Sequence, residues 1–140
     1  MPSSTTRFAP NVPQDKRDFI LSFYSTTDNR NAIDEVCRPV RFSPGRINAD
    51  HDCGSVKEWR INSWKGIATR DHTAKQVFTI DQECSQVMID GTLTYGLENG
   101  KSISVDWAAK MVFATGTQQL RMKEYQVWAD MSPLVAALKA

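Results

Sequence analysis

The sequence predicts an α+β fold in which N-terminal helices cover one face of a curved antiparallel sheet. In the first half of the chain apolar residues recur at helical spacing, whereas from residue 75 onward they alternate with polar residues in four successive segments. Helices followed by long antiparallel strands is the order of an α+β fold. A curved sheet closed by helices forms a cone, and the cavity of such a cone is a common place for small ligands.

The first half of the chain predicts an arm followed by three helices. Residues 1–12 are rich in Ser, Thr and Pro and are typical of a flexible arm, so we place the single domain at 13–140. Pro13 suits a first helical turn, and Pro39 ends the second helix. The predicted elements are helices over 13–27, 31–38 and 55–70, with a short strand over 40–42.

The second half predicts an antiparallel meander and a short final helix. The strands are expected over 75–80, 86–97, 102–114 and 119–129, and the helix over 132–138. In the second and third strands the period of two gives one apolar face. Its residues are Val87, Ile89, Leu93, Tyr95 and Leu97, then Val105, Trp107, Ala109, Met111 and Phe113. In the last strand period alone does not choose between two faces, Met122, Gln126 and Trp128 or Tyr125 and Val127.

The composition of the chain does not indicate a charged binding partner. The formal charge of +1 and the charged content of 24% give no field for nucleic acid. No run approaches the ~20 apolar residues that span a bilayer, and the N-terminus lacks a signal-peptide pattern. We expect a cytoplasmic protein with neither nucleic-acid nor membrane partners.

Metal and cofactor sites are not indicated either. The cysteines Cys37, Cys53 and Cys84 are widely spaced and odd in number, which favours a reduced setting over a disulfide framework or a zinc site. His51 beside Asp52 offers fewer ligands than zinc normally takes, and the chain has no Gly-rich phosphate loop. We expect no cofactor and no metal.

The leading candidate for chemistry is His72. The helical pattern changes to a strand pattern at residues 71–80, and the period of two puts His72 on one face with Ala74, Gln76, Phe78 and Ile80. A histidine on an apolar face at the mouth of a sheet is a candidate general acid/base. The alternative is a half-buried histidine that bonds a carbonyl in the last turn of the third helix.

Asp28 is the expected partner of His72. It follows Tyr24 by four residues and Ile20 by eight, which places it on the inward stripe at the end of the first helix. A carboxylate there opposes the helix dipole and needs a compensating partner. His72 would be that partner, and Asp28 would fix its tautomer. The alternative is that Asp28 and Asn29 merely build the turn before the second helix.

Aromatic residues could line a pocket for a flat hydrophobic ligand, or form ordinary core. The candidates for substrate binding are Tyr24, Trp64, Tyr95, Trp107 and Trp128. The opposite strand face carries Asp90 and Asp106, and also Met88, Ala108 and Val112, which suit a homodimer contact.

Several motifs, in this order along the chain, resemble the SnoaL-like branch of the nuclear transport factor 2-like (NTF2-like) superfamily, especially its small fungal members. They are Arg70–His72, Val87–Tyr95, Val105–Ala109, and Tyr125–Asp130 followed by Ser132–Leu134. The resemblance covers about residues 13–138 and implies a cone-shaped, cystatin-like α+β barrel. The superfamily includes cyclases, dehydratases, isomerases, epoxide hydrolases and non-catalytic binding modules.

The resemblance can be carried to individual residues. Ser43 stands where ketosteroid isomerases carry their base, so that machinery is absent. Scytalone dehydratases carry an aspartate and a histidine at the positions of Asp28 and His72, but their second histidine and paired tyrosines have no secure counterparts. The resemblance therefore implies a cofactor-independent cyclase, dehydratase or isomerase for a hydrophobic polyketide- or terpenoid-like intermediate. The alternative is a non-catalytic small-molecule-binding or protein-interaction module of the same fold.

Overall fold

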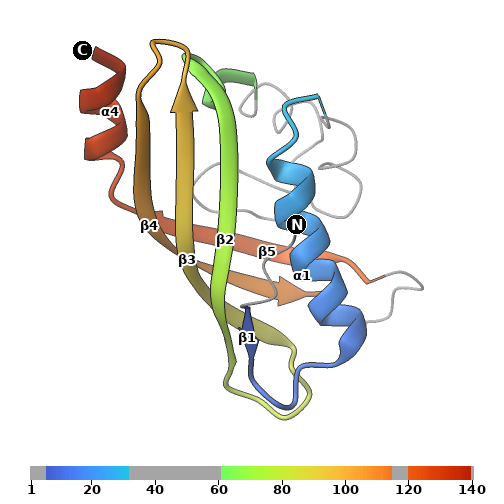
Figure 1. Cartoon of the computed structure of the whole chain (residues 1–140). Helices are drawn as coiled ribbons and strands as arrows, with labels where there is room; N and C mark the ends of the chain where they lie inside the picture. The colour runs from blue at the N-terminus through green and yellow to red at the C-terminus, as the bar shows by residue number, and fades with distance from the viewer. Residues whose placement is uncertain (1–5, 32–60, 115–119, 140) are drawn as a thin grey trace.

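A five-stranded, curved and unclosed sheet organises the molecule. The computed structural model of the chain describes residues 6–31, 61–114 and 120–139. The strand order is β1-β2-β3-β4-β5, with β1 parallel to β2 and every other pairing antiparallel (Figure 1). The strands are β1 (Arg7–Phe8), β2 (Ile67–Thr79), β3 (Gln86–Leu97), β4 (Ser102–Phe113) and β5 (Met122–Ala129). The predicted α+β class is confirmed.

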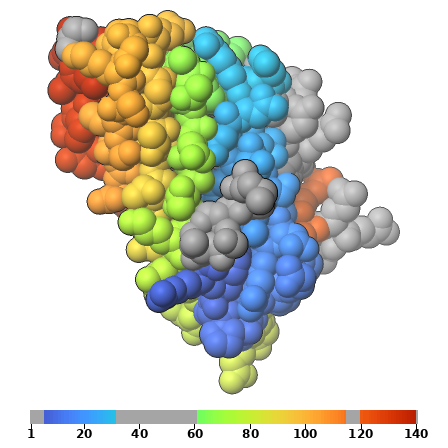
Figure 2. All heavy atoms as spheres, in the orientation of Figure 1, coloured from blue at the N-terminus to red at the C-terminus, as the bar shows by residue number. Residues whose placement is uncertain are grey.

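Two helices that accompany the sheet lie wholly within the described residues. α1 (Gln14–Thr27) lies across one face, and α4 (Ser132–Lys139) packs beside β4 (Figure 1). Figure 2 shows α1 in blue and cyan directly beside β2 in green. Both helices were predicted from the sequence, whereas almost all of the predicted helix over 31–38 and the whole strand over 40–42 lie outside the described residues. No helix in the described ranges is both long and apolar enough to cross a membrane.

The strand register defines an inner face, packed against α1, and an outer face. Three of its inner rows matter for the site. They are Arg70, Tyr95 and Ile103; His72, Leu93 and Val105; and Ala74, Gly91 and Trp107. The buried positions of β3 and β4 are the apolar faces that the period of two predicted. Aromatic contacts from α1, such as Phe19 on Phe113 at 5.7 Å between ring centroids, close this core.

A β-bulge at Lys75 corrects the predicted face of β2. The register shifts between Ala74 and Gln76, so one extra residue enters the strand. His72 and Ala74 lie on the inner face as predicted, but the next inner residue is Val77. The expectation that Gln76, Phe78 and Ile80 share the face of His72 is wrong, because a bulge reverses the alternation beyond it. Phe78 is 47% exposed and Ile80 is 80% exposed.

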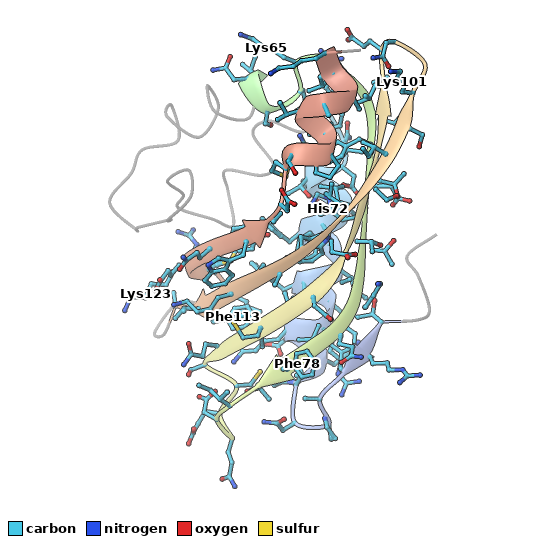
Figure 3. All side chains as sticks on the ribbon, turned by 90° about the vertical axis from the view of Figure 1, so that its left-hand side faces the viewer. Lys65, His72, Phe78, Lys101, Phe113 and Lys123 are labelled. Atoms are coloured by element: carbon cyan, nitrogen blue, oxygen red, sulfur yellow. The ribbon has the colours of Figure 1, made fainter. Side chains whose placement is uncertain are left out.

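The predicted third helix ends earlier than residue 70. Residues 61–63 are helical, but Gly66 has φ +75°, a left-handed conformation that commonly ends helices. The chain turns there, and β2 begins at Ile67. His72 therefore lies well inside a strand, and Figure 3 places it about halfway along the sheet. The alternative that it ends a helix is wrong.

β5 also contains a register shift. Val112 pairs with Glu124, but its neighbour Phe113 pairs with Met122, so Lys123 is the extra residue. Met122 and Tyr125 are both buried as a result. After Lys123 the register selects the face of Tyr125 and Val127, which pair with Met111 and Ala109, and the extra residue brings Met122 to that face as well.

The expected flexible arm over residues 1–12 needs correction for its described part. Arg7 and Phe8 pair with Gln76 and Val77 in the only parallel pairing of the described sheet. Val12 is 2% exposed. Residues 6–12 therefore contribute to the fold, because an edge strand offers backbone groups that a short segment can pair with.

Candidate functional site

Asp28 lies at the C-terminal end of α1, where its carboxylate turns toward β2. It is the C-cap residue, and its backbone N–H donates to the carbonyl of Tyr24 at 3.1 Å. The following residue, Asn29, makes the turn contact, because its side-chain oxygen accepts the N–H of Asn31 at 3.0 Å. Asp28 therefore does more than build the turn.

The carboxylate of Asp28 holds His72 at two points. Oδ2 accepts the backbone N–H of His72 at 2.9 Å, and Oδ1 lies 2.5 Å from the ring nitrogen Nδ1. Backbone and ring are thus fixed by one carboxylate across 44 positions of sequence. The side chains remain 14% exposed for His72 and 19% for Asp28. The predicted hydrogen-bond contact between these residues is confirmed.

Two aromatic rings pack against the His72 ring. Tyr24 lies 5.1 Å away and Trp107 lies 5.7 Å away, and they are 4.8 Å from each other, all between ring centroids. Trp107 reaches this position because Gly91 lies under its indole. A Cβ added at Gly91 would meet that indole at 2.7 Å and the carbonyl oxygen of Thr73 at 2.1 Å. In the row of Ala74, Gly91 and Trp107, the two small residues therefore leave space for the indole of the third.

A buried tyrosine pair continues this cluster. The hydroxyls of Tyr24 and Tyr125 are 3.1 Å apart. Burial raises the pKa of both phenols, and for Tyr24 the neighbouring Tyr125 adds to the effect. Both side chains are therefore neutral hydrogen-bonding groups near neutral pH.

Arg70 occupies the inner row next to His72. Its guanidinium lies 4.5 Å from the ring of Trp64 and 5.7 Å from that of Tyr95, each measured to the ring centroid. Nη2 donates to the carbonyl of Ser63 at 2.9 Å. Burial lowers the pKa of Arg70, and the electrostatic interactions with Tyr95 and Asp28 oppose this. A cation is thus held beside the Asp28–His72 pair.

The five predicted aromatic residues divide into three groups. Tyr24 and Trp107 contact His72, whereas Trp64 and Tyr95 surround Arg70. Trp128 pairs with Ala108 on the outer face and is 45% exposed. Trp128 therefore lies apart from the Asp28–His72 pair, and its role in substrate binding stays a prediction.

Sequence reasoning missed Arg70 and Tyr125 as members of this cluster. The spacing of Arg70, two residues before His72, was a usable signal once both lie on one strand. For Tyr125 the alternation offered two faces without choosing between them, because the phase of β5 is set by its pairing with β4.

Comparison with solved structures gives proteins of the same architecture at low sequence identity. An NTF2-like protein of unknown function from Burkholderia pseudomallei K96243 superposes with a TM-score of 0.69, at 13% identity, over 91% of this chain and 100% of that one. A protein described as a SnoaL-like polyketide cyclase, from Shewanella denitrificans OS-217, gives a TM-score of 0.66, at 14% identity, over 91% of this chain and 98% of that one. The chain has the SnoaL-like, NTF2-like fold.

The SnoaL-like fold also occurs in a protein with a different described activity. AclR from Streptomyces galilaeus, described as a hydroxylase, gives a TM-score of 0.63, at 14% identity, over 91% of this chain and 98% of that one. No protein-family model and no curated protein sequence matches the chain. The comparisons therefore confirm the architecture that the resemblance implied, and the chemistry has to be argued from Asp28, His72 and their neighbours.

Proposed function

We propose that the protein is a cofactor-independent cyclase, dehydratase or isomerase that moves protons on a hydrophobic, polyketide- or terpenoid-like intermediate. His72 is the general acid/base, and Asp28 orients it. The observation that carries the proposal is the double hydrogen bond from His72 to one carboxylate. A neighbour of the same fold that is described as a polyketide cyclase supports this reaction class at the level of the fold.

The geometry of the pair favours one tautomer of His72. An ionised carboxylate only accepts hydrogen bonds, so Nδ1 carries the proton that Asp28 holds. In a neutral imidazole Nε2 then has the lone pair that takes a proton from the substrate. When Nε2 is protonated, the carboxylate stabilises the charged ring, and Nε2 later returns the proton to another substrate atom.

The surroundings of the pair favour a flat, apolar ligand. Tyr24 and Trp107 provide ring faces beside His72, and rings stack on such faces at low entropic cost. The partial exposure of His72 and Asp28 leaves them accessible to a ligand.

Deuterium exchange into enolisable aromatic ketones tests the base without knowledge of the natural substrate. β-Tetralone and benzoylacetone, incubated with the protein in D₂O and followed by NMR, report abstraction of the proton next to the carbonyl. We expect His72→Ala to slow exchange by roughly 10² to 10⁴-fold, the usual contribution of a positioned acid/base group. Asp106→Asn, on the outer face, is the matched control and keeps the wild-type rate. Equal rates in the wild-type protein and His72→Ala would contradict the assignment of His72.

The rival function is a binding module of the same fold without chemistry. The observation that favours it is the filling of the inner face, where Trp107, Tyr95 and Phe113 are 5%, 4% and 4% exposed. A binding module would take up aromatic ketones, as shown by calorimetry, while their protons exchange no faster than in buffer.

We also propose that two copies pair through the outer face. Met88, Ala108 and Val112 lie there half-buried in the single chain, and exposed Trp128 lies in the row of Ala108. Apolar residues that remain accessible on a sheet face suit contact with a second copy.

A further inference from the structure

Two buried nitrogen donors lie beside His72. They are Nε of Arg70 and the indole Nε1 of Trp107, and neither has a hydrogen-bond partner among residues 6–31, 61–114 and 120–139. Buried N–H groups are nearly always paired, because an unpaired one loses its hydration without compensation. Two such donors next to one histidine point to an acceptor that a ligand supplies.

The sheet register places the donors on either side of His72. Arg70 belongs to the inner row before that of His72, and Trp107 to the row after it. Trp107 also contacts the His72 ring edge to face, with an interplanar angle of 74°. The inner rows thus place one unpaired N–H donor before His72 and one after it.

Both donors are held in place before any ligand arrives. The guanidinium of Arg70 is stacked on Trp64 and bonded to the carbonyl of Ser63. The indole of Trp107 lies over Gly91, where a methyl group would not fit. Donors that are fixed in advance need no reorganisation when charge develops on a ligand.

The net charge of the site rises when His72 takes up a proton. Arg70 is positive and interacts electrostatically with Asp28, so with a neutral His72 the three side chains sum to zero. Proton uptake by His72 makes the sum positive, at the moment when the substrate that lost the proton has become negative. In a partly buried site the attraction between the two is stronger than in water.

We propose that Arg70 and Trp107 bind the oxygen of an enolate or a carboxylate, so that the site takes flat apolar ligands that carry or acquire a negative charge. The enolate part of this proposal rests on the proposed function. In that reaction the C–H bond next to a carbonyl breaks, the proton goes to Nε2 of His72, and the electron pair moves onto the carbonyl oxygen between the two donors. When the proton is returned to the substrate, the oxygen loses that charge, so no oxidant or other reactant is needed.

Calorimetric titration with β-naphthoate and its neutral amide, β-naphthamide, tests the anion preference. The wild-type protein should bind naphthoate more tightly, by the roughly 10- to 100-fold that hydrogen bonds to a charged group give. Arg70→Gln should bring the two affinities to within about threefold, because it removes the charge and keeps a polar side chain of similar length. Arg30→Gln is the matched control. Arg30 also lies over the Trp64 ring, at 5.9 Å, but its side chain is 53% exposed and pairs with Glu98, so its loss should keep the preference.

An experiment on the unmodified protein covers the case in which Arg70→Gln does not fold. Naphthoate should shift the ¹H–¹⁵N NMR signals of the Trp107 indole and the Arg70 Nε–H downfield, and naphthamide should shift them less. Absence of these shifts, equal wild-type affinities, or a preference that survives in folded Arg70→Gln overturns the proposal.

His72→Asn separates this proposal from the proposed function. The variant should lose deuterium exchange and keep the preference for naphthoate, because Arg70 and Trp107 are intact. If the wild-type protein shows the preference but no exchange above that of His72→Asn, the anion site stands and the base assignment fails. If exchange depends on His72 but naphthoate and naphthamide bind equally, the anion site fails alone.

Discussion

The inner and outer faces of the sheet carry similar residues in different states. On the inner face Asp28 accepts two hydrogen bonds from His72, and Trp107 is packed over Gly91. On the outer face Asp90 and Asp106 are exposed carboxylates that, with Trp128, line an open groove of about 880 Å³. The same two chemistries, carboxylate and indole, are thus fixed on one face and solvated on the other.

This difference shows why residue type alone did not identify the site. A carboxylate becomes suited to orienting a base when a partner fixes it and little water competes for it. Asp28 meets both conditions, whereas Asp106 is exposed and has no side-chain hydrogen bond within the described residues, although both lie near a tryptophan or tyrosine in the sequence. Four experiments test how far the contrast between the faces extends.

The largest effect is expected for Asp28→Asn. The amide oxygen can still accept the backbone N–H of His72, but the amide carries no charge to stabilise a protonated ring. We expect deuterium exchange of β-tetralone to fall by roughly 10²-fold, within the range of a positioned acid/base system. Asp90→Asn on the outer face should keep the wild-type rate. A wild-type rate in Asp28→Asn would show that the carboxylate has no part in orienting His72.

Gly91→Ala should destabilise the protein by about 1–3 kcal/mol or more, the usual cost of overpacking. The added methyl group would collide with the Thr73 carbonyl and the Trp107 indole. Urea unfolding followed by circular dichroism measures the change. Ala108→Ser, its counterpart in the neighbouring row of the outer face, should stay within about 0.5 kcal/mol of wild type. Similar losses in the two variants would remove the distinction between a packed and an open face.

Tyr125→Phe should cost about 0.5–1.5 kcal/mol through loss of the hydroxyl contact with Tyr24. The wild-type protein should also lose stability in alkali. The pKa values of both phenols are raised in the folded state. The stability that the two neutral phenols contribute is therefore fully present below the unfolded pKa of 10.0, and it is lost as pH rises through their pKa values in the folded state. Unfolding midpoints between pH 8 and 11 check this, and Tyr24→Phe with Tyr125→Phe should fall less steeply. An equal slope would exclude the pair as the cause.

Trp128→Asp should have the smallest effect on the stability of the single chain, within about 0.5 kcal/mol, because the side chain is 45% exposed. Its effect on assembly should be larger if the outer face pairs two copies. Light scattering should then give about twice the chain mass of 15.8 kDa for wild type and the single mass for the variant. The single mass for wild type would contradict the dimer.

Spacing in the sequence predicted the contact between Asp28 and His72. The helical period predicted that Asp28 lies on the same stripe of the first helix as Tyr24, and the strand period predicted that His72 lies on the inner face. The structure has both residues at these places. The same reasoning failed where one residue changes the phase of a strand. The bulges at Lys75 and Lys123 depend on which residues of the neighbouring strands they oppose, and that pairing is not encoded in a local period. Gly66 was the one local signal that could have corrected the start of β2.

The bulge at Lys75 changes the phase of β2 between His72 and Val77, and a second register shift lies earlier in the strand, between Ile67 and Thr69. Val77 and His72 are separated by five positions, so strict alternation would place them on opposite faces, and only the extra residue lets both point inward. After Lys75 the inner residue is Val77 of the core, and before Lys75 the inner residues include Arg70 and His72 of the site. Loss of Lys75 would leave the two residues four positions apart, so regular alternation would keep both on the inner face without a bulge.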